Sequence, residues 1–183
     1  MPSTSASGEQ KPRIEPLAED EWDDVLRALV SRFPSGADRP LNIFTTLGRH
    51  PTLFRKWLGF GGALLDGRIG SRQRELLILR TAHNCSSEYE WAQHVPLARA
   101  AGVEEAEIAA LRSPLGPETF ESSELAMLSA ADEIHAEGTI ADPTWEALAV
   151  ELDDASLIEL VMLVGQYHHV ATIVRTLRIQ LET

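Results

Sequence analysis

Apolar residues recur at intervals of three and four positions along most of this chain, which is the spacing of one face of an α-helix. The first such run extends from Trp22 to Val30 and stops near Pro34, where turn-forming residues follow. The same pattern predicts a helix opening at Ser71 and others over residues 42–48, 51–65, 87–101, 104–111, 122–137, 142–152 and 154–181. Because no stretch alternates apolar and polar residues as a strand does, we predict an all-α fold.

The helix that opens at Ser71 contains an almost uninterrupted apolar run, Leu76-Leu77-Ile78-Leu79. A helix with so little polar surface is buried on most sides, so we expect it at the centre of the fold. The most apolar segment, residues 157–173, is interrupted by polar side chains, among them Glu159 and Gln166. We therefore expect no transmembrane span.

The length of 183 residues suits one domain with a sizeable core. Residues 1–10 are rich in serine and other small residues, without the basic start and apolar run of a secretory signal. We predict a disordered tail over residues 1–15 and one domain over residues 16–183. The last helix carries more apolar surface than one such bundle needs to hide, so we also expect a homo-oligomer.

The charge balance narrows the choice of partners. Sixteen basic against 28 acidic residues give a net charge of -12, which disfavours binding to nucleic acid or anionic lipid. The single cysteine, Cys85, excludes an internal disulfide and a zinc site built from cysteines, and it fits a reducing compartment. We therefore expect a cytoplasmic protein whose partner is a small molecule.

The candidate chemistry lies around the start of the helix over residues 87–101. Ser87, Glu90 and His94 are separated by three and four positions, so they share one stripe of that helix. Glu75 comes twelve residues before Ser87 and is followed by apolar residues, so its carboxylate is expected to be partly buried. A buried carboxylate needs a partner, for which His94 and Arg80 are the candidates.

A purely structural interpretation accounts for the same spacing. Ser87-x-x-Glu90 has the form of a capping box, in which the serine and glutamate satisfy backbone N–H groups at the helix start. Glu90 and His94 also have the spacing of a surface pair that stabilises a helix by only a few tenths of a kcal/mol. Spacing alone favours this structural interpretation, because helix starts of this form are common.

Several motifs together resemble the carboxymuconolactone decarboxylase and alkylhydroperoxidase-D superfamily. They are Arg74-Glu75-Leu76, Tyr89-Glu90-Trp91-x-x-His94, the segment 98–102 and Gly165-Gln166-Tyr167-His168. The resemblance extends over roughly residues 20–180 and implies a helical bundle of the alkylhydroperoxidase-D-like type. Residues 157–176 also look like residues 76–94, which would fit a duplicated helical unit, although two core helices of one bundle look alike without duplication.

In the peroxidase branch of this family, the positions of Ser87 and Glu90 hold two cysteines, flanked by a glutamate and a histidine. Here Glu75 and His94 match the flanking residues, and both cysteines are replaced. A serine hydroxyl cannot reduce a peroxide or form a disulfide, so the two-cysteine chemistry is lost. The resemblance then implies the decarboxylating branch, which acts on a lactone acid without metal or organic cofactor.

In this interpretation the chain is a lyase or isomerase for a small carboxylated or lactone-like substrate. His94 is the proton carrier, Glu75 fixes its tautomer, and Glu90 faces the same cavity. The expected substrate-binding side chains are Ser87, Tyr89, Arg80, Tyr167 and His168. No metal is expected, although Glu75, Glu90, His94 and His168 would make a reasonable ligand set.

Two other functions stay open at this point. Cys85 could act as the reactive thiol of a peroxidase that uses an external thiol, or it could be a packing residue beside Asn84 and Ser86. Alternatively, the chain is a ligand-binding member of the fold without catalysis. His135 and the pair His168-His169 are each most simply core histidines, and only the resemblance favours His168 for the pocket.

Overall fold

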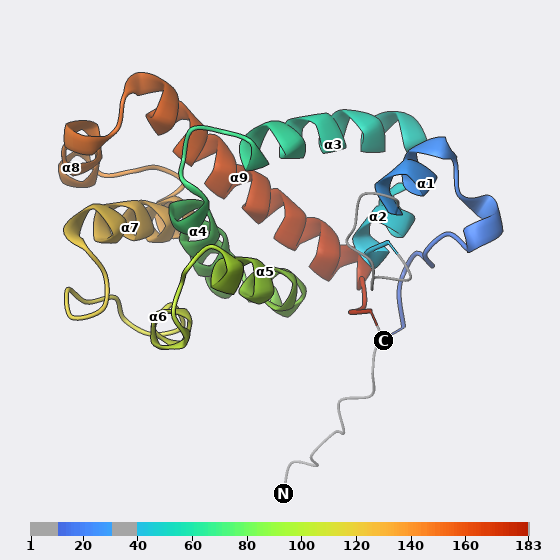
Figure 1. The fold of residues 1–183 in the computed structure, drawn as a ribbon, viewed down its shortest axis with the longest axis horizontal. Coiled ribbons are helices and arrows are strands. Elements are labelled where there is room, and N and C mark those ends of the chain that lie inside the picture. The colour runs from blue at the N-terminus through green and yellow to red at the C-terminus, as the bar shows by residue number, and fades with distance from the viewer. Residues whose placement is uncertain (1–10, 31–39, 183) are drawn as a thin grey trace, which may run out of the picture. The chain divides into compact units, whose positions relative to one another are not determined.

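The computed structural model describes residues 11–30 and 40–182, and these residues form helices without any strand (Figure 1). The all-α prediction is therefore confirmed. A short 3₁₀ helix at Glu19–Glu21 comes first. The α-helices follow in the order α1 (Asp24–Val30), α2 (Asn42–Leu47), α3 (Pro51–Leu65), α4 (Ser71–Asn84), α5 (Glu88–Ala100), α6 (Glu105–Ala110), α7 (Ser122–Glu137), α8 (Asp142–Glu151) and α9 (Asp154–Leu177).

The predicted helix ends agree with these bounds to within a few residues. Helix α9 differs most, because it ends at Leu177 and not at residue 181. Arg178 adopts a left-handed conformation with φ 56°, and the N–H of Ile179 donates to the carbonyl of Val174 at 2.9 Å. Such a stop is normally signalled by glycine, so an arginine there gives no warning in the sequence. The predicted stop near Pro34 lies outside the described residues.

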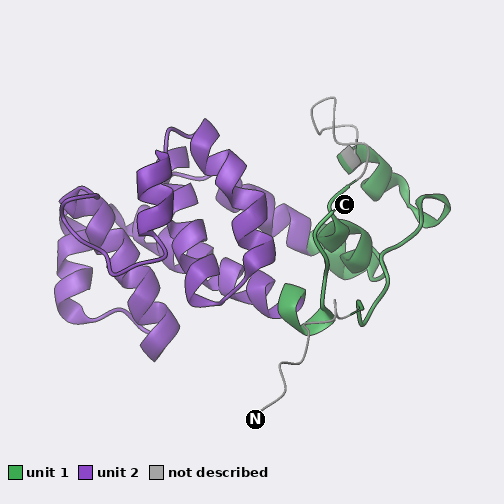
Figure 2. Ribbon diagram, turned by 90° about the horizontal axis from the view of Figure 1, so that it is seen from below, with its two compact units in different colours: residues 1–56, 174–183 green, residues 57–173 purple. Residues whose placement is uncertain are grey.

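Contacts divide the described chain into two compact units, where the sequence predicts one domain over residues 16–183 (Figure 2). The first unit comprises residues up to 56 and from 174 on. Within it, the N–H of Arg13 donates to the carbonyl of Leu177 at 2.9 Å, and the side chain of Asn42 donates to the carbonyl of Gln180 at 3.0 Å. Arg13 is thus tied to the end of α9, while the tail over residues 1–15 stays a prediction; residues 1–10 lie outside the described part.

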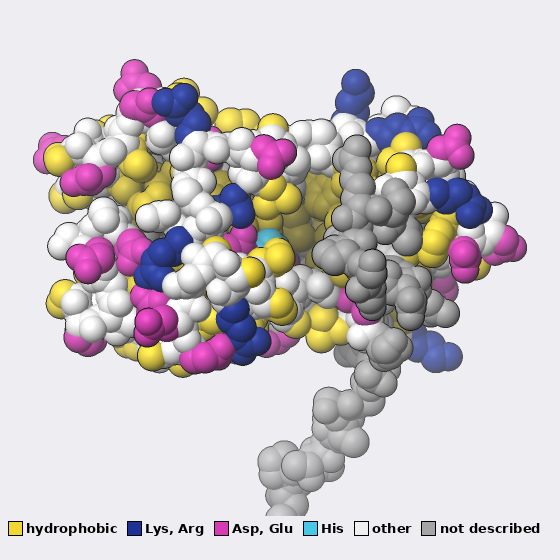
Figure 3. Space-filling view, viewed as in Figure 1, with side chains coloured by type: hydrophobic (Ala, Val, Ile, Leu, Met, Phe, Trp, Pro, Cys, Tyr) yellow, Lys and Arg dark blue, Asp and Glu magenta, His cyan; other side chains and the backbone are white. Residues whose placement is uncertain are grey.

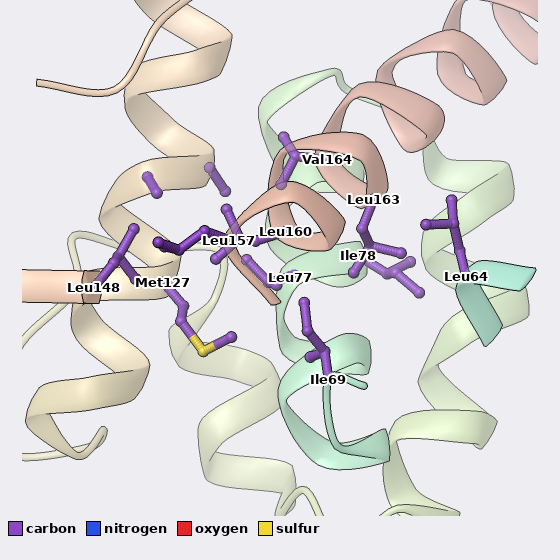
Figure 4. Close-up of a cluster of buried hydrophobic side chains, with 12 residues drawn as sticks. Leu64, Ile69, Leu77, Ile78, Met127, Leu148, Leu157, Leu160, Leu163 and Val164 are labelled. Carbon is purple, nitrogen blue, oxygen red and sulfur yellow. The ribbon is translucent and has the colours of Figure 1, made fainter. Parts of the chain in front are cut away.

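The second unit, residues 57–173, is built around α4. Eight consecutive residues of this helix, from Glu75 to Ala82, are buried, as the dense apolar run predicts. Leu77 and Ile78 enter one core cluster with side chains of α7, α8 and α9, whereas Leu76 and Leu79 enter a second with side chains of α5, α6 and α7. Figure 4 shows the first cluster. A polar side chain on α4 therefore lies between two apolar clusters.

Helix α9 is the one helix within residues 11–30 and 40–182 that is long and apolar enough to cross a membrane. A core helix meets the same criterion, and α9 places Leu160, Leu163 and Val164 in the first cluster. Its Glu159 accepts hydrogen bonds from the N–H groups of Arg68 and Ile69 at 2.8 and 2.9 Å. These contacts tie α9 to the loop before α4 and identify it as a core helix.

Charged side chains of both signs are mixed on the face of the molecule shown in Figure 3. Lysine and arginine lie among acidic side chains there and form no continuous basic region. Hydrophobic side chains show between them, as is normal for a protein surface.

Candidate active site

The turn between α4 and α5 sets the direction in which the candidate residues point. Ser86 takes a left-handed conformation with φ 52°, which ends α4. Its N–H donates to the carbonyl of His83 at 2.9 Å, and the N–H of Ser87 donates to the carbonyl of Ala82 at 2.8 Å. This pair of bonds is a Schellman motif, and it turns the chain directly into α5 at Glu88. Helices α4 and α5 therefore pack side by side with the motif residues on both.

Glu75 of α4 is only 1% exposed and has two partners. Its Oε2 lies 2.8 Å from Nδ1 of His94 on α5, so the predicted contact between the two side chains is confirmed. Its Oε1 accepts a hydrogen bond from Nε of Arg74 at 3.2 Å. Both oxygens of a carboxylate deep in an apolar helix are thus satisfied, which is what its burial requires.

The contact with Glu75 assigns different tasks to the two ring nitrogens of His94. A carboxylate accepts hydrogen bonds, so Nδ1 carries the proton and Nε2 is the nitrogen that can exchange a proton with another molecule. Tyr167 of α9 packs its ring edge against the imidazole, with centroids 5.0 Å apart and planes at 85°. The carboxylate and the aromatic ring together fix the orientation of His94.

Glu90, one turn before His94 on α5, is 2% exposed, and burial raises its pKa to about 8. The nearby hydroxyl of Ser87 opposes this rise, yet the two side chains do not meet in a hydrogen bond of normal geometry. Within the described residues, both carboxyl oxygens of Glu90 and the hydroxyl of Ser87 have no partner. Glu90 is therefore a neutral carboxylic acid near pH 7, and it has donor and acceptor capacity to spare.

The interpretation of Ser87 and Glu90 as a capping box or a surface pair is wrong. Ser87 is the residue before α5, but its side chain makes no capping hydrogen bond. Glu90 and Ser87 are both buried, which also excludes a surface pair. The same local sequence suits an exposed capped helix and a buried polar cluster, and only the packing of α5 against α4 distinguishes them.

Tyr167 brings a third helix, α9, next to Glu75, Glu90 and His94. It lies on α9, and burial raises the pKa of its hydroxyl above the usual range, helped by the nearby carboxyl groups of Glu75 and Glu90. The phenol therefore stays protonated and lies within electrostatic range of both acids. We call Glu75, Glu90, His94 and Tyr167 the acid/base cluster; α4, α5 and α9 each contribute to it.

Arg80 does not belong to this cluster, although the sequence suggests it as a substrate-binding residue or as the partner of Glu75. Its guanidinium forms a bidentate pair with Asp132 of α7, at 2.6 and 2.7 Å. Nη1 donates to the carbonyls of Leu111 and Ser113 at 2.7 and 2.9 Å. With its donors used in this way, Arg80 is a structural tie between α4, α7 and the segment after α6, and the prediction for it is wrong.

His168 also points elsewhere, because successive side chains on a helix differ in direction by about 100°. Its ring lies against that of His135, with centroids 5.2 Å apart, and not against His94. The pKa of His168 is lowered by burial and by the neighbouring His135. Cys85 belongs to the same place, since its Sγ lies 3.8 Å from Nδ1 of His135. Tyr89, the remaining candidate, is buried on α5 next to Glu90.

Sequence reasoning missed two features of this region. Arg74 is a direct partner of Glu75 although neighbouring side chains on a helix do not normally face each other. The approach of Cys85, His135 and His168 brings together positions that are 50 and 33 residues apart, and no periodic pattern indicates it.

Comparisons with known proteins agree with this fold. Residues 51–133 match the Carboxymuconolactone decarboxylase family. The debrominase Bmp8 has a TM-score of 0.79 at 14% identity, with 93% of this chain and 92% of that chain covered. A peroxidase-related protein with an alkylhydroperoxidase AhpD core from Ralstonia eutropha JMP134 has a TM-score of 0.79 at 17% identity, with the same two coverages of 93% and 92%.

A protein of unknown function from Agrobacterium tumefaciens, described as a putative antioxidant defence protein AhpD, has a TM-score of 0.66 at 19% identity. The match covers 75% of this chain and 95% of the Agrobacterium chain. No curated protein matches the sequence. At these identities the solved structures establish the alkylhydroperoxidase-D-like fold alone, while the family match includes Glu75, Glu90 and His94. Residues 51–133 therefore match the family that the motifs around Glu75 and His94 predict, and the motif from Gly165 to His168 lies outside this match.

Proposed function

We propose that this protein is a cofactor-free lyase or isomerase that uses the acid/base cluster on a small carboxylated or lactone-like substrate. The observation that carries the proposal is the pairing of a buried, oriented histidine with a buried neutral acid. His94 is held by Glu75 at 2.8 Å, and Glu90 has a pKa of about 8 with no hydrogen-bond partner within the described residues. Unsatisfied buried polar atoms beside an oriented imidazole are typical of a site that awaits a ligand.

The proposed reaction is the loss of carbon dioxide from a lactone acid with migration of a double bond. The bond from carbon to the carboxylate breaks, and its electron pair moves into the conjugated system of the lactone. Nε2 of protonated His94 then delivers a proton to carbon and is recharged from solvent. The reaction consumes one carboxylate group and one proton, and it yields carbon dioxide and a lactone with a C–H bond in place of that carboxylate.

The other residues of the cluster have supporting roles in this scheme. Glu90, as a neutral acid, donates a hydrogen bond to the lactone carbonyl, where negative charge accumulates as carbon dioxide leaves. Glu75 holds the tautomer and the orientation of His94 through the contact at 2.8 Å. Arg74 supplies a positive charge beside the pair, which favours an anionic substrate. The apolar side chains around α4 strip water from the departing carboxylate.

A thiol-dependent peroxidase is less well supported by the geometry. That reaction would need Cys85 beside the histidine of the motif, whereas its Sγ contacts His135. Cys85 is also the only cysteine of the chain, so an oxidised thiol has no internal partner to resolve it.

To test this proposal, the protein is incubated with carboxymuconolactone and related unsaturated lactone acids in deuterated water, and the products are analysed. We expect release of carbon dioxide and one solvent deuteron on carbon in the product, because the proton comes from His94 after exchange with solvent. Glu90→Gln should lower turnover at neutral pH, whereas Glu88→Gln, an exposed neighbour on the same helix, should leave it unchanged. Binding of these acids without turnover would instead support a ligand-binding protein without catalysis, and reduction of hydroperoxides that needs Cys85 would overturn the proposal.

A further inference from the structure

A second group of reactive side chains lies in the same unit but outside the acid/base cluster. Cys85 follows directly after α4, His135 lies in the last turn of α7, and His168 lies on α9. One thiol sulfur and one ring nitrogen from each histidine lie within 4.8 Å of one another. These three residues, the Cys-His-His group, come from three helices and converge on one point.

The spacing of the ligand atoms suits a metal ion. Zinc binds thiolate sulfur at about 2.3 Å and imidazole nitrogen at about 2.0 Å in a tetrahedron, so its ligand atoms lie about 3.5 Å apart. The Sγ of Cys85 and Nδ1 of His135 are already 3.8 Å apart. The three ligand atoms lie within 4.8 Å of one another, so side-chain movements of about 1–1.5 Å would bring them to the spacing that zinc requires.

The state of His168 is an independent observation that points to a ligand. Its Nε2 atom is buried and has no hydrogen-bond partner in the part of the chain that the structure describes. A buried imidazole nitrogen without a partner loses the hydrogen bonds it would make to water, so it needs compensation. A metal ion bound by Cys85 and His135 would supply it, because neutral imidazole is a strong metal ligand.

The surroundings favour a cation and allow it to enter. Cys85 caps the C-terminal end of α4, and His135 lies two residues before the end of α7. Helix C-termini carry partial negative charge, which stabilises a bound cation. The side chain of His135 is exposed and Cys85 is half-buried, so the group is open to solvent on one side.

We propose that Cys85, His135 and His168 form a binding site for a borderline-soft transition-metal ion, Zn²⁺ above all. Thiolate and imidazole ligands select such ions over Mg²⁺ and Ca²⁺, which prefer oxygen. Three protein ligands leave the fourth position of the tetrahedron to water or to a small ligand, as in catalytic zinc sites. The site is separate from the acid/base cluster and does not depend on the function proposed for it.

Titration of the full-length, metal-free protein with Zn²⁺ and with Co²⁺ tests this site. We expect one equivalent of Zn²⁺ to bind and to raise the thermal unfolding temperature, since binding to the native state adds to stability. Co²⁺ should give a sulfur-to-metal charge-transfer band in the near ultraviolet together with the strong visible bands of tetrahedral cobalt. The Co²⁺ spectra are recorded on the unaltered protein, so this part of the test does not depend on whether a variant folds.

Cys85→Ser, His135→Ala and His168→Ala should each weaken Zn²⁺ binding at least about tenfold, and Cys85→Ser should abolish the charge-transfer band. His169→Ala is the matched control, because this neighbouring histidine on α9 is exposed and lies outside the group. The proposal is overturned if the protein takes up no Zn²⁺, if Co²⁺ gives no thiolate band, or if the affinity for Zn²⁺ is the same in Cys85→Ser and His168→Ala as in the unaltered chain.

Discussion

Nδ1 of His94 lies 2.8 Å from Oε2 of Glu75, and the glutamate is 1% exposed between the two apolar clusters of the second unit. A carboxylate in such a place does more than neutralise charge. It determines which nitrogen of the imidazole carries the proton and therefore which nitrogen can serve a substrate.

Replacement of Glu75 by glutamine should disturb the tautomer of His94 without unfolding the protein. Glutamine has almost the same shape, but its amide is a weaker acceptor than a carboxylate and can also present a donor to Nδ1. We expect the nitrogen-15 NMR spectrum of His94 to show protonation on Nδ1 in the unaltered chain and a mixture of tautomers in Glu75→Gln. Unchanged nitrogen shifts in the variant would contradict the orienting role of Glu75.

Glu90 should make stability depend on pH. In the folded chain its pKa is about 8, whereas the ordinary value is 4.5. Between these values the folded state binds more protons than the unfolded state, so stability falls as pH rises and the loss is complete above about pH 8. Glu90→Gln has no proton to lose there, so the variant should be more stable than the unaltered chain at pH 9, by a few kcal/mol at most.

Denaturant unfolding at pH 5 and pH 9 measures this effect. Glu88→Gln is the matched control on α5, because Glu88 is exposed and its hydrogen bonds to Arg112 lower its pKa. If Glu90→Gln and the unaltered chain lose stability equally between the two pH values, Glu90 does not titrate as described.

Ser86 offers a second test of the local structure around the site. Its φ of 52° is unfavourable for a residue with a side chain and favourable for glycine. We expect Ser86→Gly to stabilise the protein by about 0.5–1 kcal/mol, measured by denaturant unfolding. Ser86→Ala is the control, because alanine keeps the strain, and a gain of the same size in that variant would show that the conformation is not the cause.

The solvent face of α9 carries Ile158, Val161 and Met162, which are 60%, 41% and 45% exposed. They follow the spacing of a helical stripe, so we keep the prediction of a homo-oligomer with this stripe in the interface. Light scattering should give a mass above the 20.1 kDa of one chain, and Val161→Glu should shift it towards the monomer. Val150→Glu on α8, where Val150 is 80% exposed, should have no effect. A monomer at micromolar concentration would disprove the prediction.

The sequence predicts the helices well because their apolar faces repeat along the chain. The dense run from Leu76 to Leu79 even indicates that α4 is central, since no helix can expose such a surface. The contact between Glu75 and His94 follows from the motif spacing together with the need to compensate a buried charge. Whether the helical unit is duplicated stays a prediction.

The directions in which the other site residues point depend on the packing of the helices, which no local sequence pattern encodes. Ser87 and Glu90 have the spacing of a cap, and only the position of α5 against α4 buries both without forming it. Tyr167 and His168 are neighbours in the motif, yet the rotation between adjacent helical side chains sends one to His94 and the other to His135. Arg80 is likewise committed to Asp132, a residue 52 positions further along the chain.

The most direct test of the acid/base centre is the turnover of Glu75→Gln, His94→Asn and the double variant, measured at neutral pH on the lactone acid that the unaltered protein converts. Because the two side chains act as one unit, we expect each single variant to lose about a hundredfold or more, and the double variant to be little worse than His94→Asn alone. A double variant that keeps its activity would show that Glu75 and His94 are not the catalytic centre.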